Sequence, residues 1–442
     1  MSLPTQVAEE LRGLGPTHKL YYEDAYIREF DSQVIKKIAF SGKIYLVLKA
    51  TAFFAESGGQ KGDSGILIGP RGRFRVINTI PVNEDVVVHV CEPIKGNISE
   101  NERVHGVIDW DKRYGRMRHH TASHIVFAAT REVLGVSRLI YMGVDVHENW
   151  ARIDVNYDAP ITDEQLLRIE ELSNKVCLEN RPVRIFYMDR EEAERIYGDK
   201  LGVTEVTPGG RVRVVEIKDW DVALCSGTHV KSTAEIGMIK ILERYKLEKG
   251  VQRIRLAAGL SAYKKFADIV SRAFRTARLL NASLEDFDVK LEALLKKHKE
   301  LESRVKKISK RLIRYEAESL LQRAEKIGEY KLIAYKSSEF DPETARGIAL
   351  EAVRKDPSSV IIIGCIADKP YLIAVAGKNL VEHGLKMNEF IEDLRDILRG
   401  RGGGSPKIIQ FVGESFSKLD DALIFLQTKI RSRVEDITGR HG

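Results

Sequence analysis

The stretch Arg118-His119-His120-Thr121-Ala122-Ser123-His124 decides the fold around it, because it carries two histidines four residues apart ahead of an apolar run. On a helix, residues i and i+4 lie on one face, so both imidazoles can point at one ion. Cys225 and His229 repeat this spacing later in the chain. Imidazole and thiolate are ligands that zinc prefers and that magnesium and calcium do not. The sequence predicts one Zn²⁺ per chain, held by His120, His124, Cys225 and His229. For the first pair alone, two histidines that align by chance are an equal alternative.

The composition is that of a soluble, multi-domain protein. The 442 residues include 43% hydrophobic and 31% charged side chains, and the net charge of +7 favours a polyanion such as nucleic acid. No long apolar run or signal-peptide pattern is visible, so we expect a cytoplasmic protein without a membrane partner. Cys91, Cys177 and Cys365 have no paired spacing and are expected to be buried thiols rather than disulfides.

Residues 1–107 are predicted to form a small β-barrel. Short β-branched runs at 44–48, 73–77 and 86–90 are separated by Gly, Pro and Asn turns. Between them lies the glycine-rich stretch 51–65, in which Gln60 and Asp63 stand among glycines. Such a loop can bring backbone N–H groups close to a ligand, and a plain flexible hairpin is the alternative.

Residues 108–260 are predicted to form a two-layer α/β domain that contains the zinc site. A helix is expected to follow His120, and a second covers 161–180, with Thr162 and Gln165 as a capping box. Strands are expected at 151–155, 183–188, 212–217 and 237–243, in one sheet with the helices on one face.

Residues 261–328 are predicted to form a helical hairpin or coiled coil. The second helix has an apolar heptad stripe that packs either against the preceding helix or against a second chain. Its charges, twelve Lys or Arg against eight Asp or Glu over 286–326, are either a solvated face or a basic edge for nucleic acid. The stripe consists of Phe287, Leu291, Leu294, His298, Leu301, Val305, Ile308, Leu312, Tyr315 and Ser319.

Residues 329–442 are predicted to form a separate α/β unit. Strands at 331–336, 360–366, 371–376 and 407–411 alternate with helices at 342–354, 387–398 and 416–434. Before the last strand stands 399–406, Arg-Gly-Arg-Gly-Gly-Gly-Ser-Pro, which either wraps a phosphate or is a flexible linker.

Taken together, these motifs resemble the editing half of alanyl-tRNA synthetase and the long form of the free-standing alanyl-tRNA editing proteins. The resemblance rests on Glu56-Ser57-Gly58-Gly59-Gln60 with Asp63, on 120–124, on Cys225-Ser226-Gly227-Thr228-His229, and on 250–254. It extends into the C-terminal domain, which these proteins share with DHH-type phosphoesterases. The DHH metal motif is missing here, so phosphoesterase activity is not implied.

The resemblance implies hydrolysis, in trans and without aminoacylation, of the ester in mischarged Ser-tRNA(Ala) or Gly-tRNA(Ala). It also implies binding of the tRNA acceptor end and a homodimer through the C-terminal domain. The alternatives are a non-catalytic tRNA-binding module and the editing half of a split synthetase. Expected substrate-binding residues are Thr51, Ser57, Gly58, Gly59, Gln60, Asp63 and Tyr141, and expected tRNA-binding residues are Arg399, Arg401, Gly402, Gly403 and Gly404.

The chemical role of zinc stays open at the level of sequence. Zinc can activate a water or anchor the substrate, so a zinc-bound water is the candidate catalyst and no catalytic side chain is assigned. Four protein ligands are typical of a structural zinc. Our hypothesis is that at least one of them, His124 or Cys225, is loosely bound or displaced, so that a water or substrate atom can join. Tyr141 and Val144 stand where synthetases of this family tend to place Gln and Ser, which puts the preference for a seryl over a glycyl substrate in doubt.

Overall fold

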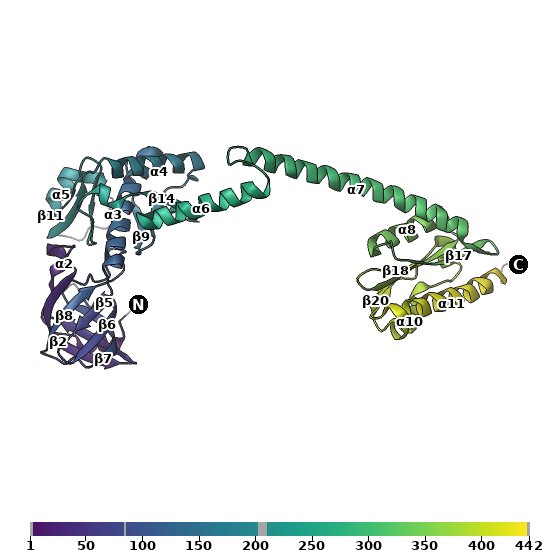
Figure 1. Cartoon of the computed structure of the whole chain (residues 1–442), viewed down its shortest axis with the longest axis horizontal. Coiled ribbons are helices and arrows are strands. Elements are labelled where there is room, and N and C mark those ends of the chain that lie inside the picture. Colours follow the sequence, from purple (N-terminus) through teal and green to yellow (C-terminus); the bar gives the residue numbers. More distant parts are fainter. Residues whose placement is uncertain (1–2, 84, 202–209, 440–442) are drawn as a thin grey trace. The chain divides into compact units, whose positions relative to one another are not determined.

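The computed structural model describes residues 3–83, 85–201 and 210–439. The chain divides into two compact units, Met1–Arg278 and Leu279–Gly442 (Figure 1). The finer domain boundaries at 107, 260 and 328 stay predictions. Within the described ranges, no helix has the length and the apolar character that crossing a membrane requires.

The first unit begins with the predicted barrel, which the structure confirms. Six strands close on themselves in the order β2-β3-β7-β6-β5-β8 (Figure 1). Phe53, Leu67 and Phe74 fill the interior, and the short helix α1 (Thr5–Glu10) packs Val7 against an outer cluster. The strands are β2 (Glu29–Phe40), β3 (Lys43–Leu48), β5 (Gly65–Ile68), β6 (Gly72–Pro81), β7 (Val87–Gly96) and β8 (Arg103–Ile108), with β1 (His18–Lys19), α2 (Leu20–Glu23) and β4 (Ala50–Thr51) beside them.

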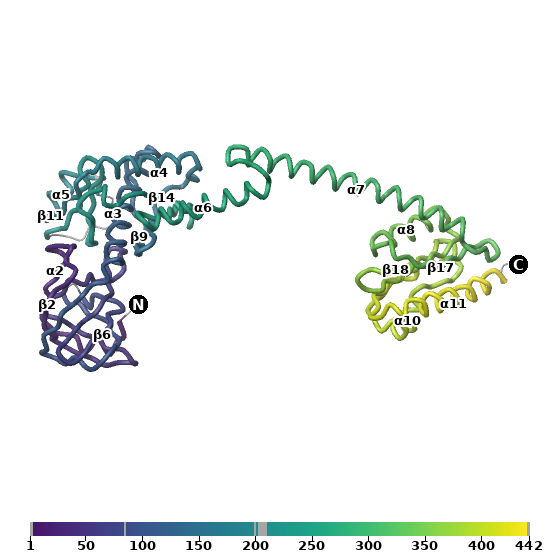
Figure 2. Tube along the Cα trace, in the orientation of Figure 1, coloured from purple at the N-terminus to yellow at the C-terminus, as the bar shows by residue number. Residues whose placement is uncertain are grey.

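A long buried helix, α3 (Trp110–Leu134), follows the barrel directly. It starts earlier than the expected helix because the Asp109 carboxylate accepts a hydrogen bond from the Lys112 N–H and caps it. Gly135, with φ of 65°, ends the helix in the left-handed conformation. The continuous tube in Figure 2 leads from the barrel into this helix. The predicted histidine pair therefore lies in the middle of a rigid element.

The single sheet expected after α3 is in fact two sheets. Four strands pair in the order β14-β15-β10-β9, and three pair separately as β11-β12-β13. The sequence prediction missed β9, β13 and β15. Polar and glycine residues interrupt β9, and β13 has only four residues. The strands are β9 (Tyr141–Val146), β10 (Ala151–Asn156), β11 (Val183–Asp189), β12 (Arg211–Ile217), β13 (Asp221–Leu224), β14 (Ile239–Glu248) and β15 (Val251–Ala258).

The helices of this unit cover the two sheets. The helix predicted over 161–180 is α4 (Asp163–Leu178), and the Thr162–Gln165 capping box is present. Buried side chains of α3 and α4 form one core with those of the four-stranded sheet, among them Ile125, Ile153 and Ile169. The remaining elements are α5 (Arg190–Tyr197), η1 (Gly198–Leu201), η2 (Thr233–Ile236) and α6 (Leu260–Leu279).

The second unit contains one six-stranded sheet with helices on both faces, and all four predicted strands are present. The strand order is β16-β17-β18-β19-β21-β20, parallel between β17 and β18 and antiparallel elsewhere. The strands are β16 (Glu325–Ile327), β17 (Tyr330–Ser337), β18 (Ser359–Ile366), β19 (Pro370–Ala376), β20 (Arg401–Gly404) and β21 (Ile408–Val412). The helices are α8 (Pro342–Lys355), α9 (Lys378–Glu382), η3 (Met387–Phe390), α10 (Ile391–Leu398), η4 (Phe416–Lys418) and α11 (Leu419–Gly439).

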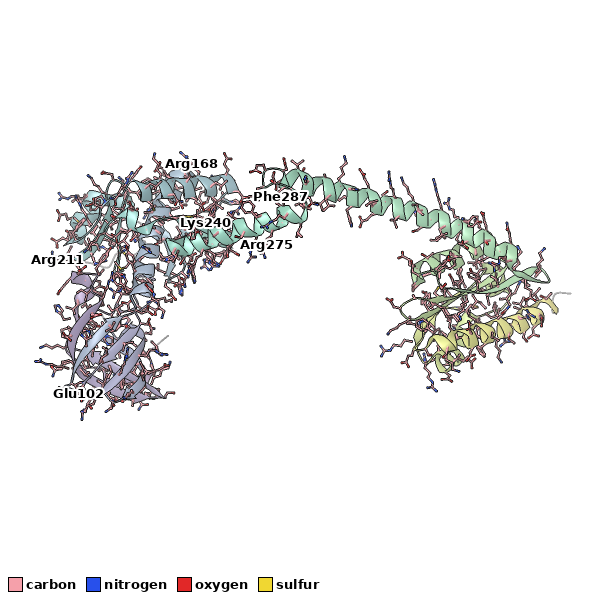
Figure 3. The ribbon with its side chains drawn as sticks, viewed as in Figure 1. Glu102, Arg168, Arg211, Lys240, Arg275 and Phe287 are labelled. Carbon is pink, nitrogen blue, oxygen red and sulfur yellow. The ribbon has the colours of Figure 1, made fainter. Side chains whose placement is uncertain are left out.

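The helix α7 (Phe287–Arg323) carries the predicted heptad stripe in one unbroken element. Only Ala317 and Leu320, near its end, are buried, and they pack with α8. The stripe residues Val305 and Ile308 are 62% and 65% exposed. Figure 3 shows side chains projecting outward along this helix. A coiled coil, whether with α6 or with a second chain, stays a prediction.

Candidate metal centre

The structure brings the four predicted ligands together. His120 and His124 come from the middle of α3, and Cys225 and His229 come from the loop that follows β13. Their ligand atoms all lie within 4.8 Å of one another, and Cys225 Sγ is 3.3 Å from Nε2 of both His120 and His229. A tetrahedral zinc with bonds of about 2.0–2.3 Å places neighbouring ligand atoms roughly 3.3–3.8 Å apart. The cluster therefore fits a zinc ion without rearrangement of the backbone.

Two of the histidines are oriented by hydrogen bonds from Nδ1. Gln60 Oε1 accepts from His120 Nδ1 at 2.9 Å, and the Gln60 amide is itself fixed by both the N–H and the hydroxyl of Thr228. Thr121 Oγ1 accepts from His229 Nδ1 at 3.1 Å and donates to the Met117 carbonyl. Each bond leaves Nε2 unprotonated and directed toward the metal position.

The third histidine uses a buried carboxylate. His124 Nδ1 lies 3.2 Å from Asp221 Oδ2, and Asp221 is also paired with Arg131. Burial lowers the pKa of His124, but the hydrogen bonds and charges of the Asp221 carboxylate and of Cys225 together outweigh it and raise the pKa to about 10. This carboxylate–histidine pair is the usual support of a histidine that binds a metal. The sequence signal for it was one acidic residue at the start of the otherwise apolar run 221–224.

The surroundings of Cys225 favour the thiolate form of its side chain. Burial raises the pKa of the Cys225 thiol. The neighbouring His120 and His229 lower it by more than burial raises it, so the pKa lies well below its ordinary value. A thiolate is the form that binds zinc. Among the four ligands, Cys225 alone is partly exposed, while the three imidazoles are buried.

His119, next to the first ligand, has a different role. Its Nδ1 donates to the Gly115 carbonyl at 2.7 Å, and its Nε2 accepts from the Ala258 N–H at 3.0 Å. Burial lowers the pKa of His119 to about 4, so the ring is neutral. His119 fixes α3 to β15 and is not a metal ligand.

The glycine-rich stretch lies directly against the loop that carries Cys225 and His229, here called the metal loop (residues 225–229). Gly58 and Gly59 both have positive φ and form a two-residue turn, closed by the paired backbone bonds of Ser57 and Gln60. A Cβ at Gly59 would lie 2.5 Å from the Val144 carbonyl oxygen, so only glycine fits. Ser57 Oγ is 2.7 Å from Ser226 Oγ and joins the turn to the metal loop.

A cavity of about 300 Å³ lies beside the metal ligands. Three of the predicted substrate-binding residues, Gly58, Gly59 and Tyr141, line it. Burial, then the charges of Asp221 and Cys225, raise the pKa of Tyr141 well above its ordinary value, so its hydroxyl is protonated. The full lining consists of Gly58, Gly59, His120, Ser123, His124, Tyr141, Val144, Leu201, Ala223, Leu224, Cys225 and Ser226.

Four other predicted substrate-binding residues are not on this lining. Ser57 lines a different cavity, together with Tyr22 and Ala55. Thr51 is buried against His89 in the barrel, and the Asp63 carboxylate pairs with Arg113. Gln60 is buried, and its side-chain amide is hydrogen-bonded to His120 and Thr228. The structure thus gives Gln60 and Asp63 positioning roles, and a contact between any of the four and substrate stays a prediction.

The predicted tRNA-binding residues lie in the second unit and form ordered structure rather than a linker. Arg399, with φ of 47°, ends α10, and Arg401 to Gly404 form the edge strand β20. All of β20 is exposed, and a Cβ on Gly404 would lie 2.0 Å from the Ile408 carbonyl oxygen. Close pairing with β21 therefore explains Gly402 and Gly404, but not Gly403, where a Cβ would meet nothing within 4 Å. Binding of tRNA by this strand stays a prediction.

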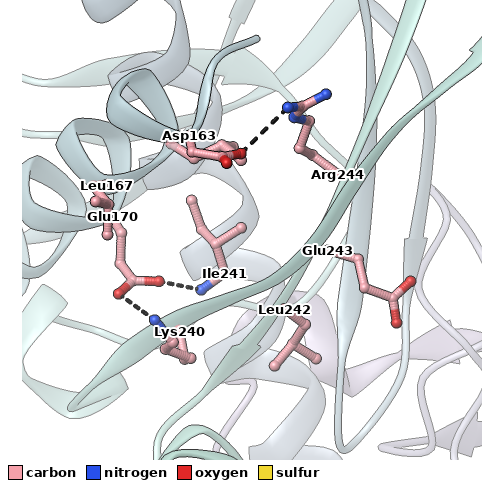
Figure 4. Close-up of a pocket in the computed structure, with 9 residues that line it drawn as sticks. Asp163, Leu167, Glu170, Lys240, Ile241, Leu242, Glu243 and Arg244 are labelled. Atoms are coloured by element: carbon pink, nitrogen blue, oxygen red, sulfur yellow. Dashed lines mark hydrogen bonds and ion pairs between the residues drawn. The ribbon is translucent and has the colours of Figure 1, made fainter. Parts of the chain in front are cut away.

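Another cavity, of about 540 Å³, lies between α4 and β14 (Figure 4). Its carboxylates are already paired. Glu170 accepts from Lys240 Nζ and from the Ile241 N–H, and Asp163 pairs with Arg244. These bonds fix α4 to the edge of the sheet. The third carboxylate of the lining, Glu243, pairs with Arg255 at 3.0 Å, so each carboxylate of the lining already has a partner.

Two family models match the chain. The model described as "Threonyl and Alanyl tRNA synthetase second additional domain" matches residues 212–255, which include the metal loop, and "tRNA synthetases class II (A)" matches 5–112, which include the barrel. The alanine–tRNA ligase of Pyrococcus abyssi is 33% identical over 415 residues, 94% of this chain and 44% of the relative. That of Ignicoccus hospitalis is 32% identical over 440 residues, 100% of this chain and 46% of the relative.

The chain is a relative of the alanine–tRNA ligases. It spans less than half the length of the curated relatives that it matches. A solved C-Ala domain from Aquifex aeolicus alanyl-tRNA synthetase covers 25% of this chain and 97% of its own, at 22% identity and a TM-score of 0.22. The predicted resemblance to alanyl-tRNA synthetase is confirmed by the sequence relatives.

Proposed function

We propose that this relative of the alanine–tRNA ligases hydrolyses the ester of mischarged Ser-tRNA(Ala) or Gly-tRNA(Ala). One observation carries the proposal: a zinc-type ligand set shares a cavity of about 300 Å³ with a rigid Gly58–Gly59 turn. A cavity of this size suits a small aminoacyl group. Resemblance to the free-standing editing proteins adds that the reaction occurs in trans and without aminoacylation.

The turn supplies the groups that would bind the ester carbonyl. The N–H groups of Ser57 and Gln60 are used within the turn. Those of Gly58 and Gly59 have no acceptor among the described residues. Backbone N–H groups that are fixed in place stabilise the negative oxygen that develops during ester hydrolysis. We assign this role to Gly58 and Gly59.

The ligand set would hold one zinc ion, through Nε2 of His120, His124 and His229 and through Sγ of Cys225. When bound, zinc supplies a Lewis acid that can acidify a water or anchor a substrate amino group or carbonyl. Gln60, Thr121 and Asp221 keep the imidazoles in the correct tautomer. Val144, Leu201, Ala223 and Leu224 exclude bulk water from one side of the cavity.

The remainder of the substrate is the acceptor end of tRNA(Ala). We propose that the second unit contributes to tRNA binding through Arg399, Arg401 and the Gly402–Gly404 edge, and that the chain forms a homodimer through this unit. Exposed arginines beside an exposed backbone edge are suited to phosphate oxygens.

The test is deacylation of Ser-, Gly- and Ala-tRNA(Ala) by the purified full chain. We expect loss of the seryl or glycyl ester well above its spontaneous rate, and little loss of the alanyl ester. Gly59→Ala should abolish the reaction, because its Cβ meets the Val144 carbonyl. Gly42→Ala is the matched control, since Gly42 also has positive φ but its Cβ would meet nothing within 4 Å.

If neither ester is lost faster than without protein, the chain is not a deacylase, and a non-catalytic tRNA-binding module becomes the better account. Adding alanine and ATP to uncharged tRNA(Ala) in the same assay tests the second part of the proposal. We expect no Ala-tRNA, and its formation would contradict action without aminoacylation.

A further inference from the structure

The hydroxyl of Tyr141 is a buried polar group without a partner inside the candidate site. Tyr141 opens β9 and lines the cavity beside His124. Its hydroxyl oxygen is buried and has no hydrogen-bond partner among the described residues. A buried hydroxyl left without a partner destabilises the protein, because it has lost its hydrogen bonds to water. Such a group in a binding cavity indicates that its partner arrives with the ligand.

The ring of Tyr141 is fixed, so its hydroxyl cannot turn away to find another partner. It stacks on Phe127 of α3 with ring centroids 3.6 Å apart and planes 12° from parallel. Tyr141 is also paired with Val155 of β10. The hydroxyl is therefore held in one place before any ligand binds, which lowers the entropy cost of using it.

Two charged side chains that do not line the cavity lie near the rings of Tyr141 and Phe127. Asp221 Oδ1 and Arg131 Nη1 are buried without hydrogen bonds, and Asp221 Oδ1 forms an ion pair with Arg131 Nη2 at 3.5 Å. Asp221 contacts His124, whose ring lies 6.1 Å from that of Tyr141, and the Arg131 guanidinium lies 6.0 Å from the Phe127 ring. Four of the side chains that line the cavity are apolar: Val144, Leu201, Ala223 and Leu224.

We propose that the Tyr141 hydroxyl hydrogen-bonds the side-chain hydroxyl of a seryl ester and so makes the seryl ester the preferred substrate over the glycyl ester. This inference rests on the proposed deacylase function. A glycyl ester brings no group that can pair with Tyr141 and leaves its hydroxyl unsatisfied. A site built to pair with a hydroxyl discriminates against the substrate that lacks it, whereas an apolar pocket does so weakly.

The experiment compares kcat/KM of the full chain on Ser-tRNA(Ala) and Gly-tRNA(Ala), for the wild type, Tyr141→Phe and Tyr245→Phe. We expect Tyr141→Phe to lower kcat/KM for the seryl ester on the order of tenfold to a hundredfold and to change that for the glycyl ester by less than about twofold. Tyr245→Phe is the matched control, because it removes the same atom from an exposed tyrosine on β14.

Equal losses on both esters would overturn the inference, since a purely structural role, such as bonding a buried water, affects both substrates alike. An unchanged seryl rate would also overturn it. A wild type that hydrolyses neither ester would remove the proposed function and this inference with it.

A second measurement does not depend on the variant being folded. Non-hydrolysable 3′-amide analogues, seryl- and glycyl-aminoadenosine, are titrated against the wild type. We expect the seryl analogue to bind about tenfold more tightly, and equal affinity would contradict the assignment of Tyr141.

Discussion

At the scale of single residues, the metal site depends as much on Gln60, Thr121 and Asp221 as on its four ligands. Each of the three accepts a hydrogen bond from the Nδ1 of one imidazole. The ligands could be predicted from the sequence, because pairs at four-residue spacing are a local pattern. The supporting residues could not, since Gln60 and Asp221 meet the histidines only through tertiary contacts across 60 and 97 positions.

We predict that Asp221→Asn weakens zinc binding about tenfold to a hundredfold, because the amide no longer carries the charge that orients and polarises His124. Zinc affinity is measured by competition with a chromogenic chelator. The control is Asp219→Asn, an exposed residue two positions away with φ of 56°, a conformation that asparagine also adopts. Unchanged affinity in Asp221→Asn would show that the carboxylate does not support the metal.

We predict that Gly227→Ala abolishes both zinc binding and ester hydrolysis. An added Cβ would lie 2.0 Å from Cε1 of His120, so the ring must leave its position. Metal content per chain after dialysis is the measurement. Gly403→Ala is the control, because a Cβ there would meet nothing within 4 Å. One zinc per chain in Gly227→Ala would contradict the placement of His120.

At the scale of elements, the barrel contains a buried histidine that makes it sensitive to acid. His89 of β7 donates from Nδ1 to the Leu46 carbonyl and accepts from the Thr51 hydroxyl at Nε2. Burial lowers the pKa of His89 to about 4. The folded pKa is thus below the unfolded value near 6.5, so the neutral ring stabilises the fold above about pH 6.5. That contribution is lost as the pH falls toward 4.

We predict that the free energy of unfolding of the first unit falls by about 1.4 kcal/mol per pH unit from this group between pH 6.5 and 4. All three tryptophans, Trp110, Trp150 and Trp220, lie in the first unit, so their fluorescence during urea unfolding reports on it alone. His89→Gln should remove this part of the slope. An identical slope in the variant would mean that His89 is protonated in the folded state.

The regular elements could largely be predicted from the sequence, and their partners less so. The predicted strands of the barrel and of the second unit are apolar, β-branched segments, and such segments can be recognised from the local sequence. The separation of β11–β13 from β14–β15–β10–β9 was not predictable, because strand pairing is decided by contacts far apart in the chain. The same holds for α7. Its apolar stripe predicts a packing partner, but the sequence does not decide between the preceding helix and a second chain.

We predict that the stripe of α7 packs against a second copy of the chain. Its apolar residues Val305 and Ile308 are exposed within the second unit. Val305→Glu with Ile308→Glu should convert a dimer into a monomer in sedimentation velocity, because it buries charge in an apolar seam. Lys306→Glu is the control on the neighbouring face. A monomeric wild type would instead indicate packing within one chain.

At the scale of the whole molecule, the candidate site for ester hydrolysis and the predicted site for tRNA binding lie in different units. The metal centre and its cavity lie entirely within Met1–Arg278, and the predicted tRNA-binding edge lies in Leu279–Gly442. Ester chemistry and tRNA affinity should therefore be separable by substitution.

We predict that Arg399→Ala with Arg401→Ala raises KM for Ser-tRNA(Ala) and leaves kcat nearly unchanged. Each lost phosphate contact should also reduce the slope of log affinity against log salt by about 1. The control is Arg354→Ala, an exposed arginine of α8 that pairs with Glu351. An unchanged KM would count against a tRNA-binding role for β20.

The central claim is that the His120–His124–Cys225–His229 cluster holds the zinc of a seryl-tRNA deacylase. The most direct test removes metal with a chelator and follows hydrolysis of Ser-tRNA(Ala) as zinc is added back. We expect a rate that is lost in the metal-free protein and returns to a plateau at one zinc per chain, with no recovery in Cys225→Ala. Full hydrolysis by the metal-free protein, or a Cys225→Ala variant as active as the wild type, would contradict it.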